Sequence, residues 1–276
     1  MESDDFNPGV DWVSLAKSGT LDLRGADLRE ADLDGINMEW SYLTGANLRG
    51  ASLEGANMSC SWMGARKHRP KVLEDAVQNG RVWNEVGLDG VKSAPPYQNA
   101  MEELLPYDES ADLSEANLRG VVVNDSICCG VKFNGADLTG AEFNWQSHFE
   151  NADFTEAILV DVVGLNANYA ILKGAIMTGS DLRSWEFHNV NMQRADLTRV
   201  NLSGVKFGQS DLTGANLEGA NLEEVKLGAS DLTLANLEGA NLKGVNLSNC
   251  RLHGANISNA IVDEPDEFLK RGAQYL

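Results

Sequence analysis

The sequence predicts an all-β solenoid built from stacked, four-sided parallel coils, because two repeat periods run through most of the chain. Within residues 205–264 every fifth residue is large and apolar, and the residue two positions earlier is small, as in Ala215 and Leu217. A longer period of twenty residues relates Val205 to Val225. Four units of five residues are therefore expected to form one coil, and the repeat region about ten coils.

The period of five fits short strands and excludes a helix. Apolar residues at this spacing would spiral over every face of an α-helix instead of forming a stripe. In a strand, residues two apart point to the same side. Ala215 and Leu217 are therefore expected to point inward and Asn216 outward, while Glu218 and Gly219 turn the corner.

The tandem units share the pattern A(D/N)LxG, as in ANLEG at residues 215–219, and this pattern resembles the pentapeptide repeat family. The resemblance implies a right-handed, four-sided parallel β-helix. The motif describes how the chain packs and does not itself mark a functional site.

The repeat frame divides the chain into five segments. The segments are an N-terminal cap at 1–20, a first repeat block at 21–64, a non-repeat insert at 65–110, a second repeat block at 111–262 and a C-terminal cap at 263–276.

Both ends are expected to carry short helices that cover the open ends of the solenoid. Near the N-terminus, Phe6, Trp12 and Leu15 are the expected covering residues, and Pro265 is expected to begin the second helix. The C-terminal residues form either a cap or a dimer contact, and the resemblance favours a homodimer because the family often pairs through this end. The candidates for this role are Phe268, Leu269, Tyr275 and Leu276.

The insert differs from the repeats in composition, since it holds four of the six prolines. Helical pieces are predicted near residues 71–79 and 99–105, and Trp62, just before the insert, is expected to pack beneath it. The repeat frame is the same on both sides, so the insert is expected to project from one corner as a binding element or a passive decoration. It opens with a basic cluster, Arg66, Lys67, Arg69 and Lys71.

Two phase breaks are expected in the second repeat block, near residues 145–147 and 160–171. At the first, one residue is added, which predicts a bulge in a strand. At the second, Gly164 falls where a large inward residue belongs, with Leu165 beside it.

The chain has a formal net charge of -19, with 41 acidic and 22 basic residues. Such a surface would repel a phosphate backbone and attract a basic protein surface, so direct nucleic-acid binding is not expected. No apolar run approaches the roughly 18 residues that span a membrane. The acidic N-terminus lacks the features of a signal peptide. These observations predict a cytoplasmic protein that does not enter a membrane.

Sequence motifs for catalysis, nucleotide binding and metal binding are absent, so the chain is not expected to be an enzyme or to hold a cofactor or metal. The four cysteines have no C-x-x-C spacing and are expected to act as small hydrophobic residues. Cys128 and Cys250 fall on inward positions, whereas Cys60 and Cys129 fall on outer or corner positions. His148 is expected to point outward.

Acidic residues gather in the middle of the sequence. Residues 111–169 contain nine acidic residues and only two basic ones, whereas residues 170–262 contain nine acidic and eight basic residues. The candidates for contact with a partner are Asp125, Glu142, Glu150, Asp153, Glu156 and Asp161.

Three functions are compatible with this pattern. The preferred one is a non-catalytic protein-binding β-helix, a scaffold or regulator that acts through its insert and its acidic mid-rod surface on a protein partner the sequence does not identify. The alternative comes from the resemblance, since some family members are DNA mimics that bind DNA gyrase or topoisomerase IV and protect against topoisomerase poisons. A carboxylate-based enzyme is the least favoured.

Overall fold

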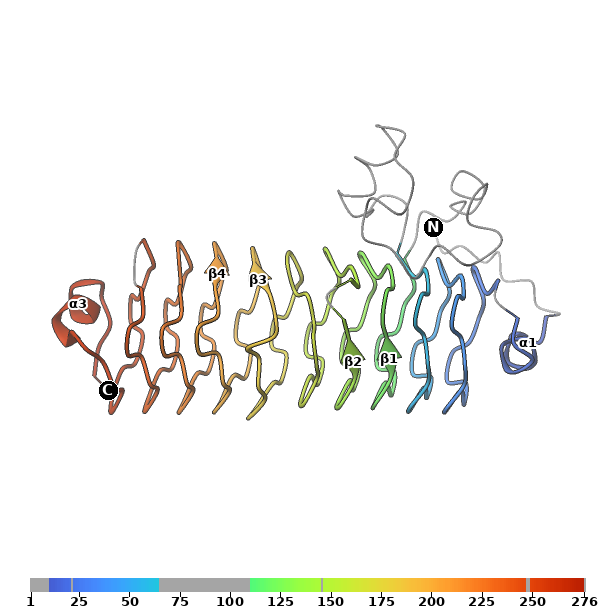
Figure 1. Cartoon of the computed structure of the whole chain (residues 1–276), viewed down its shortest axis with the longest axis horizontal. Helices are drawn as coiled ribbons and strands as arrows, with labels where there is room; N and C mark the ends of the chain where they lie inside the picture. Colours follow the sequence, from blue (N-terminus) through green and yellow to red (C-terminus); the bar gives the residue numbers. More distant parts are fainter. Residues whose placement is uncertain (1–9, 21, 65–109, 145, 247–248, 276) are drawn as a thin grey trace, which may run out of the picture. The chain divides into compact units, whose positions relative to one another are not determined.

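The computed structural model describes residues 10–20, 22–64, 110–144, 146–246 and 249–275 (Figure 1). The chain divides into two compact units. Unit 1 comprises Met1–Asp137 and Ala141–Ala152, and unit 2 comprises Leu138–Gly140 and Asp153–Leu276. Among the described residues, no helix has the length and apolar character needed to cross a membrane.

Parallel backbone pairing between residues twenty apart builds the coils of each unit. In unit 1 the pairs include Asp22 with Tyr42 and Asp27 with Asn47, and in unit 2 Asn216 pairs with Asn236. Within one turn the pairing residues follow one another at intervals of five. The sides of the coil are therefore short, as expected from the sequence, because a corner interrupts the extended backbone every five residues.

Pairs longer than one residue occur at only two places in the described part of the chain (Figure 1). In unit 1, β1 (Val122–Val123) pairs in parallel with β2 (Glu142–Phe143). In unit 2, β3 (Phe187–His188) pairs in parallel with β4 (Phe207–Gly208).

The large and small residues of the repeat fill the interior, as the sequence predicts. Leu217 and Ala220 have no exposed surface, and Ala215 is equally buried. A hydrophobic side chain at every fifth position therefore meets a small one across each layer of the coil, which keeps the interior close-packed.

The backbone geometry of the corner explains why the motif contains a glycine. The N–H of Ala220 donates to the carbonyl of Leu217 at 3.0 Å and closes a turn in which Gly219 has a φ of 63°. A positive φ at the third residue of a turn is the type II geometry that favours glycine. The N–H of Gly219 also donates to the carbonyl of Glu238 at 2.8 Å, so the corner belongs to the ladder between coils.

The Asp or Asn of the motif also supports the turn. The Oδ1 atom of Asn216 accepts the backbone N–H of Glu218 at 3.3 Å, an Asx interaction that fixes the start of the corner. The Nδ2 group of Asn236 donates to the same oxygen at 3.0 Å. Outward asparagines thus link neighbouring coils through their side chains as well as their backbones.

In unit 1 the register gains one residue after β2. Val122 pairs with Glu142, but Ile127 pairs with His148, 21 residues ahead. The added residue lies in the turn between Phe143 and His148, not in a strand as expected, because β2 keeps its pairing with β1.

In unit 2 the register loses two residues. Asp153 pairs with Ile171, 18 residues ahead. Gly164, expected at a large inward position, forms the corner instead with a φ of 74°. Leu165 then fills a small inward position and Ala167 a large one, and both are fully buried. This exchange of sizes keeps the layer filled.

The first coils continue past the insert without a break. The N–H of Ala111 donates to the carbonyl of Met63 at 2.8 Å, and Asp112 pairs with Asn47. Beside this junction, the residues at outward positions of successive coils are apolar and buried. Trp62 has 5% exposure and Ile127 has 3%. The helical pieces predicted at 71–79 and 99–105 lie outside the described residues.

Short helices lie near both ends (Figure 1). The first, α1 (Trp12–Lys17), is capped by Asp11, whose side chain accepts the N–H of Ser14 at 3.0 Å. Leu15, expected to cover the coil, is 36% exposed, and Ala16 is the buried residue.

The C-terminal helix α3 (Pro265–Lys270) begins with proline at its start and buries Phe268. Leu269 and Tyr275 are exposed at 39% and 57%. The chain then rejoins the coil, because Gln274 pairs with Asn256.

Ala220→Leu is expected to lower the free energy of unfolding by about 1–3 kcal/mol, because the added atoms overfill a closed layer. Chemical denaturation would measure the change. Glu218→Leu, which places the same side chain at an exposed corner, is the control and should have a much smaller effect. Equal midpoints for Ala220→Leu and the parent would contradict the inward assignment.

Candidate functional site

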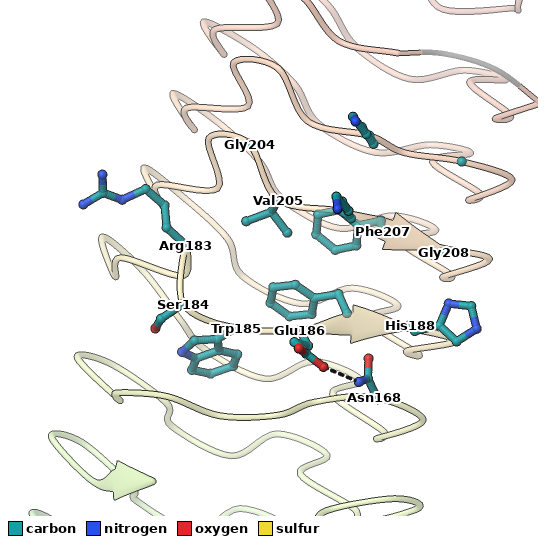
Figure 2. Close-up of a pocket in the computed structure, with 14 residues that line it drawn as sticks. Asn168, Arg183, Ser184, Trp185, Glu186, His188, Gly204, Val205, Phe207 and Gly208 are labelled. Atoms are coloured by element: carbon teal, nitrogen blue, oxygen red, sulfur yellow. Dashed lines mark hydrogen bonds between the residues drawn. The ribbon is translucent and has the colours of Figure 1, made fainter. Parts of the chain in front are cut away.

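A hollow of about 610 Å³ opens in unit 2 over β3 and β4 (Figure 2). Its charged lining includes Glu186, Lys206 and Lys226. Three glycines also line it, Gly204 and Gly228 at corners and Gly208 on β4. The opening therefore exposes both backbone and charged side chains.

The indole of Trp185 is part of the lining of the hollow. Trp185 is 4% exposed and occupies a small inward position, which Val205 fills in the next coil. The indole stacks on Phe187 with ring centroids 5.8 Å apart and donates from Nε1 to the carbonyl of Val162 at 3.4 Å. The indole is thus bonded to the preceding coil, on the side away from Val205.

The ladder between these coils is interrupted at the same point. Lys226 donates its N–H to the carbonyl of Val205 at 2.9 Å. Over the described residues, no such bond joins the N–H of Lys206 to Trp185, and pairing resumes only at Phe187 with Phe207. The hollow thus lies at a local gap in the ladder between these two coils.

The two lysines form a like-charged pair. Lys206 and Lys226 are partners in the ladder, and both side chains are exposed. Within the part of the chain that the structure describes, neither makes an ion pair. Glu186 lies one coil away, where its Oε2 accepts the amide of Asn168 at 2.8 Å (Figure 2).

His188 lies at the edge of the hollow and faces the ring of Tyr169, with centroids 5.6 Å apart at 85°. A Cβ at Gly208 would lie 2.2 Å from the Nδ1 of His188, so only glycine leaves the imidazole in this place. The hollow therefore offers cationic groups for binding, while its histidine and carboxylate have partners of their own.

A second cluster lies in unit 1. The thiol of Cys129 donates to Oε2 of Glu150 at 3.1 Å, and Nδ1 of His148 lies 3.5 Å from Oε1 of the same carboxylate. The added residue after β2 produces this contact, because it places Glu150 directly over Cys129 in the next coil.

Cys60 and Cys129, expected at outer or corner positions, are both buried. Burial, followed by the charges of Asp125 and Glu39, raises the pKa of Cys60 to about 12. Burial is also the main cause that raises the pKa of Cys129 well above its usual value. A protonated, buried thiol is a hydrogen-bond donor and a poor nucleophile.

Burial alone would raise the pKa of Glu150, but hydrogen bonds from His148 and Cys129 outweigh it and hold the pKa below its usual value. The carboxylate is thus an internal partner of unit 1. Over the described residues, no three His, Cys, Asp or Glu side chains meet in a geometry suited to a metal ion.

The other acidic candidates of unit 1 differ in exposure. Glu142 lies exposed on β2. Asp125, at a corner with a φ of 54°, accepts the amide of Asn144 at 2.9 Å.

In unit 2 the acidic candidates also divide. Asp153 accepts both the N–H and the hydroxyl of Thr155, at 2.9 and 2.6 Å. Glu156 and Asp161 lie exposed at corners with φ near 60°. The C-terminal candidate Leu276 lies outside the described residues. So do the four basic candidates, Arg66, Lys67, Arg69 and Lys71.

The sequence analysis missed the lysine pair and the hollow. Both had a signal in the sequence, since VKF and VKL recur twenty residues apart at 205–207 and 225–227. A tryptophan at a position reserved for small residues was the second signal.

Glu150→Gln is expected to destabilise the protein at neutral pH. The lowered pKa of Glu150 means that its stabilising effect is present above the unfolded value of about 4.3 and is lost as pH falls through the folded value. Denaturation from pH 7 to pH 3 should show a difference from the parent that disappears in acid. Glu156→Gln, at an exposed corner, is the control, and a constant difference for Glu150→Gln across this range would contradict the assignment.

The comparisons concern the whole chain. A family model described as pentapeptide repeats, in eight copies, matches residues 22–59, 111–145 and, through overlapping matches, 163–264. These matches cover more than half of the chain. No curated protein matches it.

Several solved structures are similar. HetL, a pentapeptide repeat protein involved in heterocyst differentiation regulation in Nostoc sp. strain PCC 7120, is 24% identical over 90% of each chain, with a TM-score of 0.44. QnrB1, a plasmid-mediated fluoroquinolone resistance protein, is 14% identical over 91% of this chain and 96% of its own, with a TM-score of 0.42. A thylakoid-lumen pentapeptide repeat protein from Arabidopsis thaliana is 24% identical over 51% of this chain and 66% of its own, with a TM-score of 0.34.

Proposed function

Because the chain belongs to the pentapeptide repeat family, we propose that it is a non-catalytic protein-binding β-helix that serves as an interaction scaffold or regulator. The observation that carries this proposal is the bond between Ala111 and Met63, which joins the two repeat blocks directly although the insert separates them in the sequence. The segment between them starts and ends at adjacent points of a regular ladder. A long segment displayed from a rigid scaffold is well placed to bind a partner. As part of the same proposal, the coils are right-handed and number about ten.

The chemistry of the described side chains supports a role in binding over one in catalysis. Cys129 carries a buried, protonated thiol, and the carboxylate of Glu150 beside it is held by internal contacts. In unit 2 the carboxylate of Glu186 bonds to an amide. None of these groups has the free partner that general acid–base or nucleophilic chemistry needs.

Exposed acids extend the proposed binding surface in each unit taken by itself. Glu142 in unit 1, and Glu156 and Asp161 in unit 2, are free to meet a basic partner. Contacts of this kind weaken as salt is added.

Mimicry of DNA toward a topoisomerase is the second candidate, and the net charge of -19 favours it. A DNA mimic needs acidic groups along its outward columns. In unit 2, however, one column carries three successive neutral asparagines that bond to one another, Asn216, Asn236 and Asn256, and another carries Lys206 and Lys226. The scaffold proposal therefore has the better support.

Deletion of residues 66–109 is expected to leave the coils folded and to abolish capture of the partner. Intact and deleted proteins would be used as baits in a bacterial lysate, with far-UV circular dichroism as the folding control. A partner held only by intact protein supports the scaffold. A topoisomerase held by both forms and lost at high salt, with altered supercoiling in a gyrase assay, would favour the DNA mimic.

A homodimer through the C-terminal end is the proposed assembly, because Leu269 and Tyr275 are exposed there. Tyr275→Ser is expected to weaken the dimer, because it removes an aromatic side chain from the proposed interface. Sedimentation equilibrium would measure the association. Leu234→Ser, which removes an equally exposed apolar residue from a corner, is the control, and a parent that sediments as a monomer would contradict this assembly.

A further inference from the structure

We propose that the hollow over β3 and β4 binds carboxylate groups from an acidic segment of a protein partner, with Lys206 and Lys226 as the cationic contacts. This inference rests on the proposed binding function and names the partner chemistry for one surface of unit 2.

The first argument is the electrostatic cost of the pair. Lys206 and Lys226 are bridged neighbours, so their backbones lie about 4.8 Å apart, and like charges at such positions repel. The structure gives neither lysine an ion-pair partner over the residues it describes. An anion between the two ammonium groups would remove this repulsion.

A bridged acidic pair in the same unit shows how such a cost is offset. Asp211 and Asp231 are also ladder partners. Gln193 donates to Asp211 at 2.6 Å, and Arg251 donates to Asp231 at 3.2 Å. The acidic pair is thus compensated within the protein, whereas the lysine pair lacks an equivalent.

The second argument is shape. The hollow lies beside Lys206, where Trp185 and three glycines without side chains, Gly204, Gly208 and Gly228, form part of its lining. Lys206 and Lys226 line the same hollow, so a ligand that enters it can reach their side chains. At Gly228 a Cβ would lie 2.9 Å from the carbonyl of Phe207, so a larger residue would disturb the floor of the hollow.

The third argument selects the kind of anion. A net charge of -19 repels a long polyanion such as nucleic acid. At physiological salt, charges act over about 8 Å, so two neighbouring lysines can hold a short acidic segment despite the overall charge. Glu186 limits the site at one end, because a ligand carboxylate that extends beyond Lys206 would be repelled by the negative charge of Glu186.

The test uses the full chain and a fluorescein-labelled octaglutamate peptide, with binding followed by fluorescence polarisation. The double variant Lys206→Gln/Lys226→Gln is expected to weaken binding by about ten-fold. The matched control, Lys173→Gln/Lys243→Gln, makes the same change in net charge at two exposed corners of unit 2 and should change binding by less than about two-fold.

Equal losses in both double variants would overturn the proposal, because net charge alone would then explain binding. Absence of peptide binding to the parent would overturn it as well, and so would full competition by an equal concentration of inorganic phosphate, which would indicate a site for small anions. If the peptide does not bind but the insert still captures a partner, only this inference is refuted. If the peptide binds but the insert captures no partner, only the proposed function is refuted.

Discussion

The backbone hydrogen bonds between successive coils are the constraint on which both units depend. Each pentapeptide supplies one pairing residue, and each corner supplies another bond, as Gly219 does to Glu238. Successive coils form these bonds only when their backbone N–H and C=O groups lie at equivalent positions. The corner therefore needs a positive φ, and the interior needs alternating large and small residues. The motif A(D/N)LxG is the sequence form of these three requirements, with Asn or Asp supporting the turn from outside.

Departures from this constraint are local and have chemical consequences. An added residue in the turn after β2 brings Glu150 over Cys129, and the carboxylate becomes an internal partner. Trp185 occupies a position that small residues fill elsewhere, and beside it the ladder lacks a bond to Lys206 and a hollow opens. The first feature lies at a change of register and the second beside a residue that departs from the motif, and at such places a packing motif can acquire a second role.

The charge of the chain and the charge of its surfaces are separate properties. The overall balance of -19 describes long-range attraction and solubility. Individual columns differ, since asparagines bond to one another on one side of unit 2 while Lys206 and Lys226 stand together on another. A partner at contact distance interacts with the charges of one column of residues and not with the net charge of the chain. Net charge alone is therefore a poor guide to what the protein binds.

The sequence by itself determined the coil, the inward residues and the corners, because these follow from a strict period that every unit repeats. It also located the insert and both changes of register, since each interrupts that period. Only the tertiary structure decided which side chains meet across coils. The contact of Cys129 with Glu150 depends on whether a single added residue lies in a turn or a strand, and the hollow depends on how two coils accommodate the indole of Trp185. Such contacts join residues about twenty positions apart, and their geometry is set by packing between layers, which a one-dimensional period does not contain.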